Sequence, residues 1–152
     1  MFLHAGDTIS GQEGKATAII DGSVQDMFYI KNLEATFEKI KTEVRTLGKR
    51  GTQHKGTGWS GTGSMTIYYV TSIFRHMALK YAKTGKDTYF DITIVNHDPT
   101  SSVGQQMMVL YNCNIDSTVL AKLDTEADVL DDDIDFTFDG FDILDSFGNP
   151  RV

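Results

Sequence analysis

A polar, glycine-rich stretch at residues 47–69 constrains the fold of this chain more than any other segment. It reads LGKRGTQHKGTGWSGTGSMTIYY, with six glycines and the basic residues Lys49, Arg50, His54 and Lys55 ahead of an apolar end. Such a segment has too few apolar side chains to bury itself. We therefore expect an extended loop or arm over about residues 45–63, which is either mobile or becomes ordered only against another molecule.

Strand patterns dominate the rest of the chain. The turn dipeptide Asp21-Gly22 predicts a hairpin with a strand on each side, and the alternation from Leu33 to Phe37 predicts a half-buried strand. Alternating, β-branched or aromatic runs predict further strands over 64–71, 87–95, 105–115 and 134–144, and a shorter candidate over 117–123. Segment 71–85 instead carries apolar residues at helical spacing and ends at Gly85, which suits a helix C-terminus. We predict one domain spanning 1–152, mainly β: an antiparallel β-sandwich or barrel with one flanking α-helix.

The composition argues against several classes of protein. A formal net charge of -7 disfavours general binding to nucleic acid. The single cysteine, Cys113, permits no intrachain disulfide, and its place in an apolar alternation predicts a buried, inert thiol. No apolar run approaches the roughly 20 residues that span a bilayer, and the first residues lack a secretory signal pattern, so we expect a soluble, intracellular protein when it is made.

Motifs for catalysis or ligand binding fail when their context is tested. GTGWSG at 56–61 matches the dinucleotide fingerprint, but a strand follows it where a helix is required. The acidic run from Asp131 to Asp135 fails the calcium-loop template because Phe136 occupies the glycine position, which favours a solvated acidic face or edge. The histidines are scattered, with His76 expected on the helix surface, and no nucleophile–base pair is visible. We expect no enzyme: no catalytic residue, no cofactor and no metal.

Charge is distributed unevenly along the chain. Basic residues concentrate over 39–55, with Glu43 as the only acid there, whereas the final third is strongly acidic. A basic arm and an acidic face on one chain are complementary in a head-to-tail sense, and such contacts build rings or filaments. The alternative, that both are ordinary solvated faces, stays open at this stage.

Three blocks of the sequence resemble the tail tube proteins of contractile phage tails: DTISGQEGKATAIIDG, LEATFEKIKTEVRTLGKRGTQHKGTGWSGTGSMTIYYVTSIF and VLDDDIDFTFDGFDIL. The likeness is greatest to the tube proteins of the defective Bacillus prophage tail and of similar Gram-positive phages and R-type bacteriocins. It covers nearly the whole chain in matching order. The resemblance implies a structural subunit of the inner tube that self-assembles into stacked hexameric rings around a lumen, with a β-sandwich or barrel and one flanking helix.

The resemblance also implies that the arm at about 45–63 reaches the adjacent ring. We expect Trp59 at the tip of the arm to anchor it, and we expect its basic side chains to meet acidic residues of the partner ring. The predicted contact residues between rings or subunits are Arg45, Lys49, Arg50, His54, Lys55, Trp59, Asp131, Asp132 and Asp133.

The implied partners are other copies of the chain, the sheath protein, and the tape-measure and baseplate or initiator proteins. In an infectious phage, DNA passes through the lumen, and acidic lumen residues would repel its phosphates so that it slides. The expected location is the host bacterial cytoplasm during assembly and then the virion tail or a released tail-like particle, without membrane insertion of the subunit. Two alternatives stay open: a related secretion-system tube subunit, and a β-barrel that binds a small ligand under a glycine-rich lid.

Overall fold

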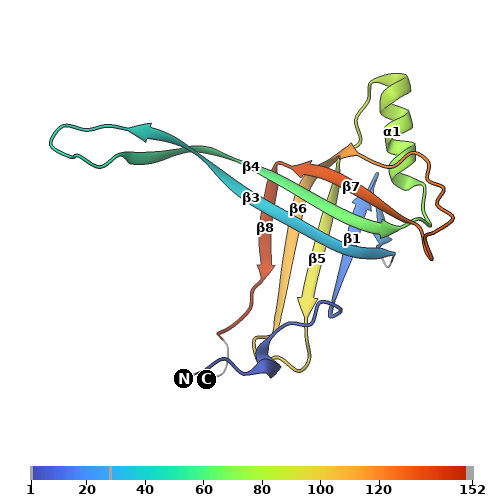
Figure 1. The fold of residues 1–152 in the computed structure, drawn as a ribbon, viewed down its shortest axis with the longest axis horizontal. Coiled ribbons are helices and arrows are strands. Elements are labelled where there is room, and N and C mark those ends of the chain that lie inside the picture. The colour runs from blue at the N-terminus through green and yellow to red at the C-terminus, as the bar shows by residue number, and fades with distance from the viewer. Residues whose placement is uncertain (1, 28, 150–152) are drawn as a thin grey trace.

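The computed structural model describes residues 2–27 and 29–149 and contains two crossing β-sheets with one α-helix (Figure 1). In chain order the elements are η1 (Ala5–Asp7), β1 (Gly14–Ile20), β2 (Ser23–Asp26), β3 (Ile30–Val44), β4 (Gln53–Tyr68), α1 (Ile73–Thr84), β5 (Phe90–His97), β6 (Gln105–Ser117), β7 (Asp131–Phe138) and β8 (Gly140–Asp145). Every strand pair is antiparallel. The predicted fold class, mainly antiparallel β with one flanking helix, is therefore confirmed.

The two sheets share strand β6. One sheet has the order β2-β1-β5-β6-β8, and the other has the order β6-β7-β4-β3. The first part of β6 pairs with β5 and β8, whereas its end, from Asn114, pairs with β7. Asn112 adopts a φ of 53 just before this change of partner. In Figure 1, β3, β4 and β7 cross steeply over β1, β5, β6 and β8, so the apolar core lies between the crossing layers.

The helix forms where the sequence predicts it. The Thr71 hydroxyl accepts a hydrogen bond from the Ile73 backbone N–H at 3.4 Å, and Gly85 ends the helix with a φ of 72. Phe74 and Met77 are buried against the core, and His76 is exposed as expected. The helix thereby covers the end of the sandwich next to β6 and β7 (Figure 1).

Two predicted strands differ from the observed ones. The candidate at 117–123 is irregular beyond Ser117, because its residues leave the sheet and run beside α1 and β7. The predicted strand at 134–144 is divided between β7 and β8, and the chain passes from one sheet to the other at Asp139 and Gly140. The apolar alternation changes phase at this corner, from Ile134, Phe136 and Phe138 to Phe141 and Ile143, and the prediction of one strand missed that signal.

Most of the glycine-rich segment is a strand. Gln53 to Gly63 belongs to β4 and pairs with β3, so only residues 45–52 form a loop. The backbone hydrogen bonds of this ladder satisfy the polar groups of the main chain, although the segment has few apolar side chains. The half-buried alternation expected from Leu33 to Phe37 is only partly present, since Leu33 is half-buried but Phe37 is 47% exposed.

Two of the glycines make room for aromatic rings. Gly61 and Gly63 lie opposite Phe138 and Phe136 of β7 in the sheet register. A Cβ atom at either glycine would lie less than 3.0 Å from three carbon atoms of the facing ring. The glycines therefore allow two buried phenylalanine rings to lie flat against the backbone of β4.

Candidate assembly surfaces

The distal half of the β3–β4 hairpin projects from the body of the subunit (Figure 1). The strands remain paired out to Val44 and Gln53. Between Lys41 and Gly56 every side chain is exposed apart from Gln53, which is half-buried. An isolated two-stranded hairpin is marginally stable in water, so this half gains no stability from packing within its own subunit.

The tip of the hairpin gathers the predicted basic residues. Arg45, Lys49 and Arg50 lie in the loop at 45–52, and His54 and Lys55 are the next residues along β4. All five are exposed. The like charges of this exposed cluster favour an acidic partner.

Trp59 lies well inside β4, opposite Lys39, so the prediction that it is at the tip is wrong. Its ring stacks on Phe37 with the ring centroids 5.4 Å apart, and it meets Phe141 edge to face, also at 5.4 Å. Phe138 completes this aromatic cluster at a centroid distance of 6.1 Å. The prediction failed because the sequence neighbours of Trp59 are small, whereas its aromatic contacts come from three other strands. The indole remains 37% exposed.

Asp131 and Asp133 lie in β7, in the body of the subunit and away from the hairpin tip (Figure 1). Lys122 lies 3.0 Å from Asp131, and their hydrogen bond lowers the pKa of Asp131 and raises the pKa of Lys122. Lys31 also approaches Asp131, at 3.6 Å. Asp133 accepts a 2.7 Å hydrogen bond from the Thr66 hydroxyl. Within one subunit the basic tip residues come together, but the acidic residues are not brought to them.

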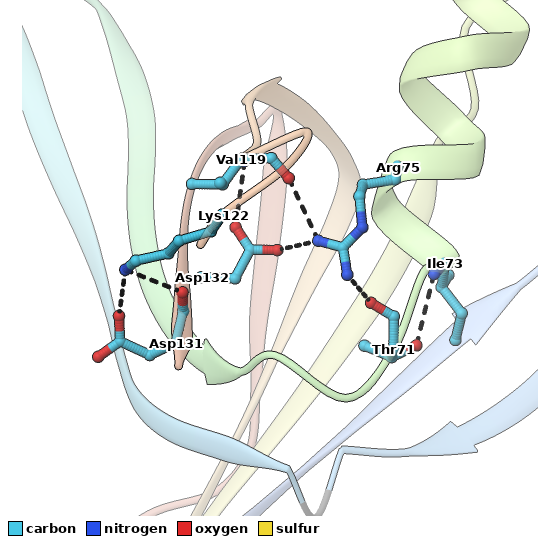
Figure 2. A network of polar contacts seen from close by, with 7 residues as sticks. All are labelled: Thr71, Ile73, Arg75, Val119, Lys122, Asp131 and Asp132. Atoms are coloured by element: carbon cyan, nitrogen blue, oxygen red, sulfur yellow. Dashed lines mark hydrogen bonds and ion pairs between the residues drawn. The ribbon is translucent and has the colours of Figure 1, made fainter. Parts of the chain in front are cut away.

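Asp132 is buried, which corrects the expectation of a solvated acidic run. Its side chain is 1% exposed and lies 2.7 Å from the Arg75 guanidinium of α1. Figure 2 shows that its other carboxylate oxygen accepts a hydrogen bond from the Val119 backbone N–H, at 3.1 Å. Arg75 also donates to the carbonyls of Val119 and Thr71, and its guanidinium lies over the Tyr69 ring. Asp132 is therefore engaged inside its own subunit and is not available to a partner's basic residue.

This network fastens three segments together. It joins β7 to the first turn of α1 and to the irregular segment 118–130 (Figure 2). Sequence reasoning placed Asp132 on the opposite strand face from its acidic neighbours but did not find its partner, because Arg75 lies on a separate helix. The burial of Asp132 could have been predicted, because Asp132 lies on the same strand face as Ile134 and Phe136.

The outward face of the β3-β4-β7 sheet carries only acidic and hydroxyl side chains over three strand segments. These segments, 34–38, 60–66 and 133–137, contain no lysine or arginine. We call this surface the acidic–hydroxyl face; it consists of Glu34, Thr36, Glu38, Ser60, Thr62, Ser64, Thr66, Asp133, Asp135 and Thr137. Sequence reasoning missed Glu34, Glu38 and Asp135 as surface-site residues, although the alternation of these strands contained the signal.

Over residues 2–27 and 29–149, no group of three or more His, Cys, Asp or Glu side chains could hold a metal ion. No helix among these residues is long and apolar enough to cross a membrane. The glycine-rich strand is paired with β3 and its distal part points away from the body, so it does not form the lid that a ligand-binding barrel would require.

Comparison with known proteins gives one consistent result. A family described as phage tail tube protein matches residues 1–145. The phage-like element PBSX protein XkdM of Bacillus subtilis strain 168 is 43% identical over 143 residues, which cover 94% of this chain and 95% of the relative. A second protein of that strain, the uncharacterized protein YqbM, matches equally well, with 43% identity over 143 residues.

Solved structures of tail and injection-system assemblies share the fold. A chain of the anti-feeding prophage baseplate has a TM-score of 0.68 at 11% identity, with 90% of this chain and 95% of that chain covered. A chain of the sheath–tube complex of an extracellular contractile injection system, PVC, also has a TM-score of 0.68 at 11% identity, covering 90% and 91%. The SPP1 tail tube has a TM-score of 0.63 at 15% identity, covering 95% and 81%.

Proposed function

The chain belongs to the phage tail tube protein family, and on this premise we propose that it builds the inner tube of a contractile tail as stacked hexameric rings. The family is a class of non-enzymatic structural proteins. The particle would be a contractile phage or a phage-tail-like bacteriocin. The observation that carries the proposal is the projecting hairpin, since the distal half of this long, paired arm packs against no other part of its own subunit.

The hairpin would stack one ring on the next. Its distal half has no packing of its own, so docking on the neighbouring ring would supply the missing contacts. The tip is basic, and of the predicted acids on β7 Asp133 is exposed, whereas Asp131 is half-buried and paired with Lys122 and Lys31. Asp132 is left out of this proposal because it is enclosed with Arg75. The Trp59 ring, at the base of the projecting half, offers a partly exposed aromatic surface for the same contact.

The acidic–hydroxyl face is the surface that we propose for the wall of the lumen. It contains four exposed carboxylates, from Glu34, Glu38, Asp133 and Asp135, and no basic side chain in its strand segments. A wall of this kind repels the phosphates of DNA, while its hydroxyls keep it hydrated. In an infectious phage, DNA would therefore pass through without sticking.

Other proteins of the particle would contact the outside and the ends of the tube. We propose a sheath protein around it, a tape-measure protein within it during assembly, and baseplate or initiator proteins at its end. Rings would form in the host bacterial cytoplasm and end in the virion tail or a released particle. The solved neighbours include an injection-system sheath–tube complex, so an injection-system tube subunit is the second candidate. Sheath and tape-measure genes beside this gene would favour a tail.

Electron microscopy of the concentrated protein tests the proposal. We expect hexameric rings that stack into tubes, alone or with the initiator proteins present. Lys49→Glu together with Arg50→Glu reverses two charges at the hairpin tip and should leave rings but abolish stacking. Lys15→Glu, an exposed charge reversal on β1, is the control and should give normal tubes. A protein that remains monomeric at high concentration under both conditions would contradict the proposal.

A further inference from the structure

A groove of about 500 Å³ lies between α1 and the end of β6, and we call it the α1–β6 groove. One face of the helix contributes Met77, Ala78 and Tyr81 to its lining, and Ile115 and Leu120 also line it. Tyr81 is 55% exposed and Leu120 is 70% exposed. The subunit therefore leaves apolar surface of this groove open to solvent, which is typical of a contact site for another molecule.

Polar groups of the groove have no partner inside the subunit. Asp87 and Asp116 line it, and both are exposed without an ion pair or hydrogen bond among residues 2–27 and 29–149. Thr118 also lines the groove, and its buried hydroxyl oxygen has no hydrogen-bond partner in the same part of the chain. A buried hydroxyl without a partner is costly, so a polar group of an occupant would stabilise it. The described lining residues include no lysine or arginine, which favours a basic occupant.

The hairpin tip has the complementary side chains. Leu47 is 103% exposed, and Lys49 and Arg50 follow it in the same loop. Neither basic side chain has an ion-pair partner among the residues that the structure describes. An apolar side chain beside two cations matches an apolar groove bordered by two carboxylates, so the two surfaces are complementary in hydrophobicity and in charge.

The tip and the groove lie at opposite ends of β4. This strand begins at Gln53, beside the tip, and ends at Tyr68, from which segment 69–72 leads directly into α1. At about 3.3 Å per residue, its 16 residues span roughly 50 Å. The tip therefore cannot reach the groove of its own subunit, and Figure 1 shows the hairpin and α1 at opposite ends of the molecule. A head-to-tail stack presents the tip of one copy to the opposite end of the next copy.

We infer that the tip of one copy docks in the α1–β6 groove of a copy in the adjacent ring, with Leu47 against the apolar lining. Lys49 and Arg50 would pair with Asp87 and Asp116. This inference rests on the proposed stacking by the hairpin, and it names the surface that receives the hairpin. Burial of Leu47 and of the exposed apolar lining would stabilise the contact.

Cysteine cross-linking tests the contact. The double variant Leu47→Cys/Leu120→Cys, assembled in reducing buffer, treated with a short bis-maleimide and quenched before denaturation, should give a ladder of covalent oligomers. Each single-cysteine variant should stay largely monomeric on a denaturing gel. The native Cys113 is 0% exposed and does not interfere. The matched control Leu47→Cys/Leu144→Cys, which places the second thiol on an exposed leucine of β8, should give no ladder.

Charge reversal gives a second readout. Asp87→Lys together with Asp116→Lys should shorten tubes at least several-fold and leave single rings, as the reversal of Lys49 and Arg50 to glutamate does. The variant that combines both reversals should stack again, because the charges are exchanged between the two surfaces. Circular dichroism checks that each variant is folded, and the cross-linking result decides where a charge variant is not.

The outcomes separate this inference from the proposed function. Tubes that give no ladder above the single-cysteine level, or an equal ladder from the Leu144 control, would overturn the inference and leave the proposed function standing. A folded variant with both reversals that fails to stack would do the same. A wild-type chain that forms no rings or tubes would overturn both.

Discussion

Alanine at Gly63 and alanine at Gly58 are expected to change the stability of the subunit in opposite directions, although both glycines lie in β4. At Gly63 a Cβ would lie less than 3.0 Å from three carbon atoms of the Phe136 ring, and that ring is 1% exposed. At Gly58 a Cβ meets no atom within 4 Å, and the backbone is not in the left-handed region. The space beside Gly63 is therefore occupied by the Phe136 ring, whereas the space beside Gly58 is open.

The two effects can be estimated separately. Replacing glycine by alanine in a strand lowers the entropy of the unfolded chain and stabilises by about 0.5–1 kcal/mol where there is room. Gly58→Ala should gain this amount. At Gly63 the overpacking of a closed core costs about 1–3 kcal/mol and outweighs the entropic gain. The variants should therefore differ by about 1–3 kcal/mol, or roughly 2–12 °C in Tm for a chain of this length.

Urea unfolding followed by circular dichroism gives the comparison, with the protein kept below the concentration at which it assembles. Tube formation would otherwise add its own stabilisation. Gly61→Ala faces Phe138 in the same way and should behave like Gly63→Ala. Equal stabilities for the Gly58 and Gly63 variants, or a more stable Gly63→Ala, would refute the argument that the Phe136 and Phe138 rings fill the space that a Cβ atom would need at Gly63 and Gly61.

Three further predictions concern the network, the aromatic cluster and the thiol. Arg75→Met leaves the Asp132 carboxylate buried without its cation and should destabilise the subunit by about 3–5 kcal/mol; adding Asp132→Leu should recover part of this loss, and unfolding of the single variant within about 0.5 kcal/mol of wild type would contradict the role of the pair. Trp59→Ala should cost about 1–3 kcal/mol, because the ring is only partly buried, and should leave the subunit folded but unable to extend tubes in electron micrographs; tubes of normal length would count against its role. Burial raises the pKa of the Cys113 thiol from 9.0 to about 12, so the folded protein keeps a proton that the unfolded chain releases. The free energy of unfolding should fall as the pH rises from about 9 to 12, by up to about 1.4 kcal/mol per pH unit, and Cys113→Ala should show a shallower fall in the same titration.

Local sequence patterns were enough to predict the helix and the strands whose apolar residues recur at a regular spacing. The spacing of apolar residues from Ile73 to Ala82 gave the helix, with Gly85 at its end. The Asp21-Gly22 dipeptide gave the β1–β2 hairpin, where both residues have positive φ. Alternation gave most of the strands, and the resemblance in three blocks gave the family. These features depend on residues that are close in sequence, so a single chain read from end to end contains them.

Only the tertiary structure shows which structural role each residue within these patterns has. Gly61 and Gly63 look like the rest of the flexible tract until β7 places two phenylalanine rings against them. Asp132 looks like its acidic neighbours until α1 brings Arg75 to it, and Trp59 acquires its neighbours from strands far away in sequence. Pairing between distant strands fixes which face of each strand is buried, and that information is not contained in the periodicity of any one strand. The sequence alone therefore identified a tube subunit with a basic arm, whereas only the folded chain revealed its acidic–hydroxyl face and its buried Arg75–Asp132 ion pair.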